Sequence, residues 1–200
     1  MNGQRERQRM VRELASAVDF DEIVETGTYR GASTLFFSHA VGVPVHSVEL
    51  LDRYFRYSER RCSRDPNISL KHGDSRAFLQ DLSKGISDHT TFFYLDAHWE
   101  QDVPRLGELE IIADGWQRAV VMIDDFLVSD DDGYRFTKYG GNALDLTYLP
   151  PLEGWKKFYP AASADEETGA RRGCLVLASS ALAPAVEALQ GLRPVNAAAC

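Results

Sequence analysis

The segment from Glu25 to Ser33 (ETGTYRGAS) joins a short apolar run to a second apolar stretch and contains two glycines, Gly27 and Gly31. Glycine has no Cβ and accepts positive φ, so such a turn lets a backbone approach a ligand closely. The helix that follows presents unpaired N–H groups to an anionic group. The spacing departs from the dinucleotide fingerprint G-x-G-x-x-G. We therefore expect a turn that binds a nucleotide or nucleoside-type cofactor; a tight strand–helix turn without ligand is the alternative.

Acidic residues stand at or just after the ends of five expected strands, and they are Glu25, Glu49, Asp74, Asp96 and the pair Asp124-Asp125. In an open parallel sheet, ligands bind beyond the carboxyl ends of the strands. Any one of these acids is explained as a helix N-cap or a solvated loop carboxylate. Together they would repel one another unless a cation is bound. We expect two cations, a sulfonium cofactor and a divalent metal ion.

The chemistry of the individual acids narrows their roles. Asp96, Asp124 and Asp125 form a set of hard oxygen donors, which suits Mg²⁺, Mn²⁺ or Ca²⁺ better than zinc. A carboxylate at Glu49 can accept the ribose hydroxyls of an adenosine, although nicotinamide enzymes use the same contact. Asp74 can accept the adenine amino group or cap the next helix.

Alternating strand and helix patterns position these residues. Strands are expected at Glu22–Thr26, Val43–Glu49, Ile68–His72, Thr91–Asp96 and Ala119–Asp124, with helices near 31–41, 52–64, 75–83 and 102–114. Apolar runs at 92–95 and 120–123 are typical of strands covered on both faces. The alternation predicts an α/β, Rossmann-like, doubly wound and mostly parallel seven-stranded sheet. Its last two strands, Lys156–Tyr159 and Cys174–Ala178, are expected to form an antiparallel C-terminal hairpin.

The remaining segments have separate expectations. Residues 4–17, within an N-terminal segment 1–18, have the pattern of an amphipathic helix with Met10, Val11, Leu14 and Val18 on its apolar face. A short helix is expected at 143–149, inside a segment 127–150 that we expect to bind substrate or to act as a lid. A last helix is expected at Pro184–Leu192.

Size and composition favour one globular domain over residues 1–200, with 44% hydrophobic residues. The net charge of -8 argues against nucleic-acid and membrane partners. The three cysteines have no metal-binding or disulfide spacing, and no secretory signal or membrane span is recognised, so we expect a cytoplasmic protein. A homo-oligomer is compatible with the sequence.

These residues together resemble the class I S-adenosylmethionine (SAM)-dependent O-methyltransferases that use a divalent metal. The segment from Glu25 to Ser33 is similar to the motif of catechol O-methyltransferases. The stretch Leu95–Trp99 and the pair Asp124-Asp125 resemble the two metal-binding stretches of that group, and the macrolide-sugar O-methyltransferases have a similar set. The resemblance covers about residues 20–126.

The resemblance implies the site residues. SAM would be bound by the turn residues Glu25, Gly27, Thr28, Tyr29, Gly31 and Ser33, by Glu49 at the ribose, by Asp74 and Ser75 at the adenine, and by Asp96. The divalent metal, Mg²⁺ foremost, would be held by Asp96, Asp124 and Asp125. The methyl acceptor would be a hydroxyl of a small molecule such as a sugar or a natural product.

The sequence departs from the catechol type at the general base. Where those enzymes have a lysine shortly after the first metal aspartate, this chain has His98-Trp99-Glu100. His98 is the best candidate base, because the unperturbed pKa of histidine, about 6.5, suits proton removal near neutrality; we expect catalysis by His98 together with Asp96. Three alternatives stay open: another SAM-dependent reaction (N-methylation or a non-methylating reaction), a non-catalytic SAM- or nucleotide-binding module, and a nicotinamide oxidoreductase.

Overall fold

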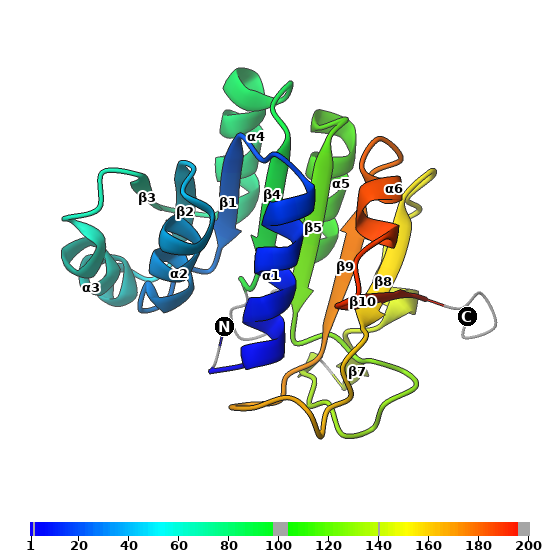
Figure 1. The fold of residues 1–200 in the computed structure, drawn as a ribbon. Helices are drawn as coiled ribbons and strands as arrows, with labels where there is room; N and C mark the ends of the chain where they lie inside the picture. The colour runs from blue at the N-terminus through cyan, green and yellow to red at the C-terminus, as the bar shows by residue number, and fades with distance from the viewer. Residues whose placement is uncertain (2, 98–103, 140, 196–200) are drawn as a thin grey trace. The chain divides into compact units, whose positions relative to one another are not determined.

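The structure, a computed structural model, describes residues 1, 3–97, 104–139 and 141–195. The chain divides into two compact units, labelled by element in Figure 1. The central unit is Phe20–Ala119, and the terminal unit combines Met1–Asp19 with Val120–Cys200. The single domain expected from the sequence stays a prediction.

The central unit contains four parallel strands in the order β4-β1-β2-β3. Its strands are β1 (Glu22–Thr26), β2 (Val45–Glu49), β3 (Ile68–His72) and β4 (Thr91–Leu95). Its helices are α2 (Ala32–Val41), α3 (Asp52–Cys62), α4 (Ser75–Ile86) and α5 (Arg105–Gly115). In Figure 1, α2 lies in front of these strands and α4 lies behind them. This confirms the predicted alternation of parallel strands and helices.

Strand β4 shows why these segments are strands of a covered sheet. The rings of Phe92 and Tyr94 lie 5.8 and 5.1 Å from the ring of Phe37 in α2. The intervening Phe93 lies 5.0 Å from Trp116, just after α5. Because successive side chains of a strand point to opposite faces, β4 is covered on both sides. The continuous apolar run in the sequence has this physical cause.

The terminal unit is built on antiparallel pairing in the order β5-β9-β8-β10. Its strands are β5 (Ala119–Asp124), β8 (Lys156–Pro160), β9 (Cys174–Ala178) and β10 (Leu192–Pro194), with a short ribbon of β6 (Lys138–Tyr139) and β7 (Asn142–Ala143). Its helices are α1 (Arg5–Ala17) and α6 (Ala183–Glu187), with a 3₁₀ turn η1 (Leu146–Tyr148). The predicted apolar face of α1 is buried, and the predicted C-terminal hairpin is confirmed as the pair β8 and β9.

Three details of the prediction were wrong. Among the described residues, the orders β4-β1-β2-β3 and β5-β9-β8-β10 contain eight strands rather than seven, because β10 pairs with β8, and the ribbon of β6 and β7 is additional. Helix α6 therefore ends at Glu187, and Leu192 belongs to the new strand. The helix expected at 143–149 is only the turn η1, since Pro150 and Pro151 disfavour helical backbone in the residues before them. Among the described residues, no helix combines the length and the apolar character that spanning a bilayer requires.

Candidate functional site

The turn after β1 is fixed to its neighbouring strands. The N–H groups of Gly27 and Thr28 donate to the carbonyl of Val48 in β2, at 3.0 and 3.2 Å. Gly27 has φ +84°, and a Cβ on it would lie 2.8 Å from the backbone of Asp96 and Ala97. Glycine is therefore required here by the close approach of the turn to the chain after β4.

Gly31 has a different neighbour. It adopts φ +69° at the N-cap of α2, and a Cβ on it would lie 3.0 Å from the Cys62 sulfur of α3. The two glycines thus let one turn pack against β4 and against α3. The predicted strand–turn–helix is confirmed, and both glycines already have a structural reason to be there.

Glu49 connects this turn to the end of β2. Its Oε2 accepts the N–H of Tyr29 at 2.8 Å, and its Oε1 accepts the N–H of Leu51 at 2.8 Å. The residue is buried, whereas Leu50 beside it is 47% exposed. A carboxylate oxygen has two lone pairs, so each oxygen of Glu49 can accept one further hydrogen bond from a ligand.

Glu25 lies in β1 and is fully buried. Its Oε2 accepts hydrogen bonds from the hydroxyls of Thr34 and of Ser47, the latter at 2.7 Å. Its Oε1 makes no hydrogen bond to any described residue. Burial raises the pKa of Glu25, and the nearby hydroxyls of Ser33, Thr34 and Ser47 oppose this shift in part. A buried acceptor without a partner fits a cofactor that brings an N–H donor.

Asp74 and Asp96 are the other two predicted acids of the central unit. Asp74 caps α4: its side chain accepts the N–H groups of Arg76 and Ala77, and the Arg76 guanidinium, 2.8 Å away, lowers the pKa of Asp74. The capping role is confirmed, and the adenine contact is untested. Ser75 is buried in the first turn of α4.

The N–H of Asp96 donates to the carbonyl of Thr26 at 3.0 Å, which places Asp96 at the same end of the sheet as Glu25 and Glu49. The predicted base, His98, lies outside the described residues.

In the terminal unit, Asp124 at the end of β5 forms an ion pair with Arg7 of α1. The side chains of Arg7 and Asp124 are 1% and 0% exposed. The Arg7 Nη1 donates to Oδ1 of Asp124, and its Nη2 donates to the carbonyl of Arg172. The N–H of Asp125 also donates to Asp124 Oδ1, at 2.9 Å.

Asp125 is buried in left-handed backbone, with φ +61°. Its Oδ2 accepts the hydroxyl of Thr137 at 2.8 Å. Its Oδ1 makes no hydrogen bond within the described chain, but it lies 3.4 Å from Nε of Arg172. A non-glycine residue held in this conformation is strained and is more frequent at functional sites.

We tested whether these residues fit the predicted metal. No three His, Cys, Asp or Glu side chains in the described ranges are grouped as a metal site. The negative charge of Asp124 already faces Arg7, and that of Asp125 faces Arg172. A hard divalent ion needs carboxylate oxygens that are free to coordinate it. As they stand, Asp124 and Asp125 do not fit a divalent ion, and the predicted magnesium has no support from their contacts.

Arg7 was not among the residues predicted from the sequence, although its spacing carried a signal. Positions 7, 10, 11 and 14 follow the i, i+3, i+4, i+7 pattern, so Arg7 belongs to the apolar stripe of α1. Glu167 was not predicted either; it accepts the N–H groups of Glu6 and Arg7 at 3.0 and 2.9 Å and so caps α1. A glutamate 160 positions away leaves no local pattern that could have predicted this contact.

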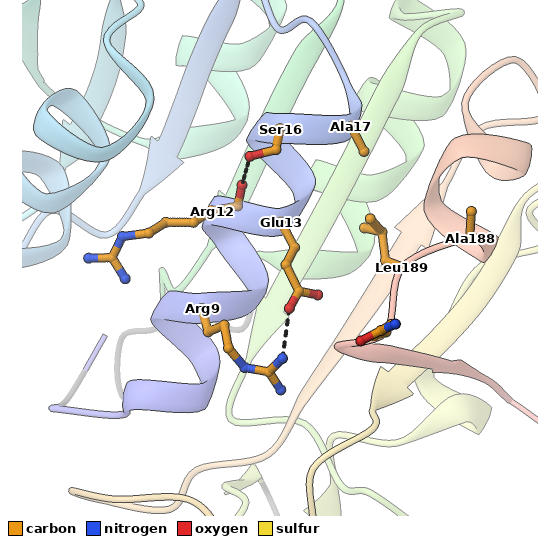
Figure 2. A pocket seen from close by; sticks show the side chains of 8 residues that line it. Arg9, Arg12, Glu13, Ser16, Ala17, Ala188 and Leu189 are labelled. Atoms are coloured by element: carbon orange, nitrogen blue, oxygen red, sulfur yellow. Dashed lines mark hydrogen bonds and ion pairs between the residues drawn. The ribbon is translucent and has the colours of Figure 1, made fainter.

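A groove of about 460 Å³ runs between α1 and the chain after α6 (Figure 2), lined by Arg9, Arg12, Glu13, Ser16, Ala17, Ala188, Leu189 and Gln190. None of the predicted site residues lines it. Two of its charged groups already have partners, because Arg9 pairs with Glu6 and Glu13 and Glu13 also accepts the N–H of Gly191 at 2.8 Å.

Comparison with known proteins shows the fold. No family model and no curated protein matches the chain. Among solved structures, the cofactor-bound Rv0187 protein from MTB has a TM-score of 0.64 and 14% identity, with 88% of this chain and 80% of that chain covered. The O-methyltransferase TomG from Streptomyces achromogenes, in complex with SAM, has a TM-score of 0.56 and 15% identity over 86% and 80% of the two chains.

The O-methyltransferase from Bacillus cereus in complex with SAH has a TM-score of 0.57 and 12% identity over 87% and 80% of the two chains. The chain thus has the α/β fold found in O-methyltransferases that bind SAM or SAH.

Proposed function

We propose that this protein is a SAM-dependent O-methyltransferase that acts on a hydroxyl of a small molecule, such as a sugar or a natural product. The observation that carries the proposal is the pair of buried carboxylates beside the glycine turn. Glu49 accepts the Tyr29 N–H of that turn, and Glu25 keeps one buried oxygen without a partner. The likeness in fold to TomG with SAM and to the Bacillus enzyme with SAH supports it.

The cofactor would be bound by the residues at this end of the central unit. Glu49 would accept ribose hydroxyls with its remaining lone pairs. The exposed Leu50 would cover a face of the purine, and Asp74 and Ser75 would meet its edge. Glu25, with the turn residues Gly27, Thr28, Tyr29, Gly31 and Ser33, would surround the amino-acid part, where the free oxygen of Glu25 would accept an ammonium N–H.

Bound SAM supplies a methyl group made electrophilic by a positively charged sulfur. The protein then has to hold the acceptor oxygen in line with that methyl group, and positioning of this kind supplies much of the rate enhancement. We assign proton removal from the acceptor hydroxyl to His98, with Asp96 beside it in the sequence. No step is assigned to a metal ion, because Asp124 and Asp125 face arginines.

The partner we propose is the small-molecule acceptor, with neither nucleic acid nor membrane, in keeping with the net charge of -8. Assembly into a homo-oligomer stays a prediction. We also propose a cytoplasmic location, in keeping with Cys62 and Cys174, which are both free and buried.

Calorimetric titration with S-adenosylhomocysteine tests the cofactor assignment. We expect saturable binding to the wild type and binding weaker by about 10- to 100-fold in Glu49→Ala, the loss that a charged hydrogen-bond acceptor causes. Glu59→Ala, an exposed glutamate of α3, is the matched control and should bind like the wild type. Binding of NAD but not of S-adenosylhomocysteine would contradict the proposal and favour an oxidoreductase.

Product analysis tests the reaction. Incubation with methyl-labelled SAM and a panel of hydroxylated small molecules should transfer label to oxygen. Label on nitrogen, or SAM consumed without methyl transfer, would replace the O-methyl assignment with another SAM-dependent reaction. Firm cofactor binding without turnover on any acceptor would favour a binding module.

A further inference from the structure

The end of β5 holds a buried pair of opposite charges. Arg7 and Asp124 are essentially inaccessible to solvent. A buried charge is tolerated only when a partner neutralises it and satisfies its hydrogen bonds. For Asp124, that partner in the terminal unit is the guanidinium of Arg7.

The Arg7 guanidinium is held in place from several sides. One nitrogen contacts Asp124, another contacts the carbonyl of Arg172, and the backbone N–H of Arg7 donates to Glu167. Gln4, one turn earlier, exchanges two hydrogen bonds with the backbone of Arg172, at 2.9 and 3.2 Å. The position of Arg7 is therefore fixed by several hydrogen bonds of the folded terminal unit.

The neighbouring carboxylate, Asp125, also faces a guanidinium group. Asp125 lies 3.4 Å from Nε of Arg172, and that arginine also donates to Thr137 at 3.1 Å. The two carboxylates at the end of β5 thus face two guanidinium groups. A divalent ion on Asp124 would have to displace Arg7 or lie against its positive charge.

We propose that Arg7 is the resident cation of Asp124 and takes the place of the divalent ion that the sequence predicted. The side chain would neutralise the buried carboxylate permanently, so the protein would need no metal at this position. The proposal does not rest on the methyltransferase assignment, because it concerns only which cation Asp124 binds.

Manganese binding to the metal-depleted, full-length protein tests this directly, with free Mn²⁺ followed by electron paramagnetic resonance. We expect the wild type to show no saturable Mn²⁺ site that depends on Asp124. Arg7→Met should gain one Mn²⁺ site, and Arg7→Met/Asp124→Asn should lose it again. Arg9→Met, an exposed arginine of the same helix, is the matched control and should behave like the wild type.

Three results would overturn the proposal. The first is a saturable Mn²⁺ site in the wild type that Asp124→Asn abolishes. The second is a folded Arg7→Met that gains no Mn²⁺ site, which would mean that Arg7 does not take the place of a divalent ion at Asp124. The third applies if Arg7→Met does not fold. The double variant Arg7→Met/Asp124→Asn should then fold, because it no longer has the charge of Asp124. If the double variant also fails to fold, neutralisation of Asp124 is not the role of Arg7. Titration with S-adenosylhomocysteine on the same samples tests the proposed function separately.

Discussion

At the scale of single residues, the acids differ by their surroundings and not by their chemistry. Glu25 is buried with one unpartnered oxygen, Glu49 accepts two backbone N–H groups, and Asp124 is paired with an arginine. The first two keep hydrogen-bonding capacity for a ligand, whereas the third has its charge neutralised by the protein itself. This difference is why we place the cofactor beside Glu25 and Glu49 and assign no metal to Asp124.

The raised pKa of Glu25 predicts a pH dependence of stability. Burial favours the protonated form of Glu25, so the folded state keeps a proton that the unfolded state releases. The contribution of Glu25 to stability is therefore complete at low pH. It falls as pH rises from the ordinary pKa of glutamate through the raised pKa of Glu25. Urea unfolding between pH 4 and 8 should show the wild type losing stability relative to Glu25→Gln over this range. Glu59→Gln, exposed on α3, should follow the wild type, and parallel curves for wild type and Glu25→Gln would refute the shift.

At the scale of elements, two helices show two ways of satisfying their first N–H groups. Helix α4 is capped by Asp74, the residue directly before it. Helix α1 has no cap from its own Gln4, and Glu167 accepts its first N–H groups from the β8–β9 connection. The first cap belongs to the local sequence, and the second exists only in the folded terminal unit.

Removing the local cap should cost a moderate amount of stability. We expect Asp74→Ala to lower the free energy of unfolding by about 1 kcal/mol, the usual effect of losing an N-cap. Asp81→Ala, later in the same helix and paired with Lys84 only at the surface, should change it by less than about 0.5 kcal/mol. Denaturant unfolding of both variants measures the difference, and equal effects would mean that the cap contributes nothing.

Removing the buried arginine should cost much more. Arg7→Met removes the guanidinium that neutralises the buried carboxylate of Asp124, and we expect a loss of about 3–5 kcal/mol. The double variant Arg7→Met/Asp124→Leu, which removes both charges, should recover most of that loss. Arg9→Met breaks only exposed ion pairs and should cost less than about 1 kcal/mol. If thermal and urea unfolding show no recovery in the double variant, the cost does not come from the lost neutralisation of Asp124.

At the scale of the whole molecule, the proposed cofactor should stabilise the fold. A ligand that binds only the folded protein adds about 2.7 kcal/mol when present at 100 times its dissociation constant. For a chain of 200 residues this corresponds to a rise in melting temperature of about 5–10 °C. We expect this rise with S-adenosylhomocysteine and none with NAD at the same concentration, measured by differential scanning calorimetry. A rise with NAD alone would contradict the cofactor assignment.

The bounds of several strands could be read from the sequence because their cause is local. Glu22–Thr26, Ile68–His72, Ala119–Asp124 and Cys174–Ala178 were predicted with the observed ends. For β5 and β9 the signal was a continuous apolar run, which marks a strand covered on both faces. Strand β3 is only partly buried, and its place in the alternation of strands and helices predicted it. The alternation of strands and helices also predicted the glycine turn and the acids at the strand ends. Strand β10 could not be found in this way, because three residues ending in proline become a strand only by pairing with β8.

By itself, the sequence determined the order of the elements from α1 to β5, the turn between β1 and α2, and the collection of Glu25, Glu49 and Asp96 at one end of parallel strands. Only the tertiary structure decided which cation Asp124 faces, that Glu167 caps α1, and that Gly27 is needed for contact with the backbone after β4. Residue patterns report backbone preference and burial, which act over a few positions. The pairing of charges depends on which distant segments meet, and the distance between Arg7 and Asp124 in the sequence carries no information about that meeting.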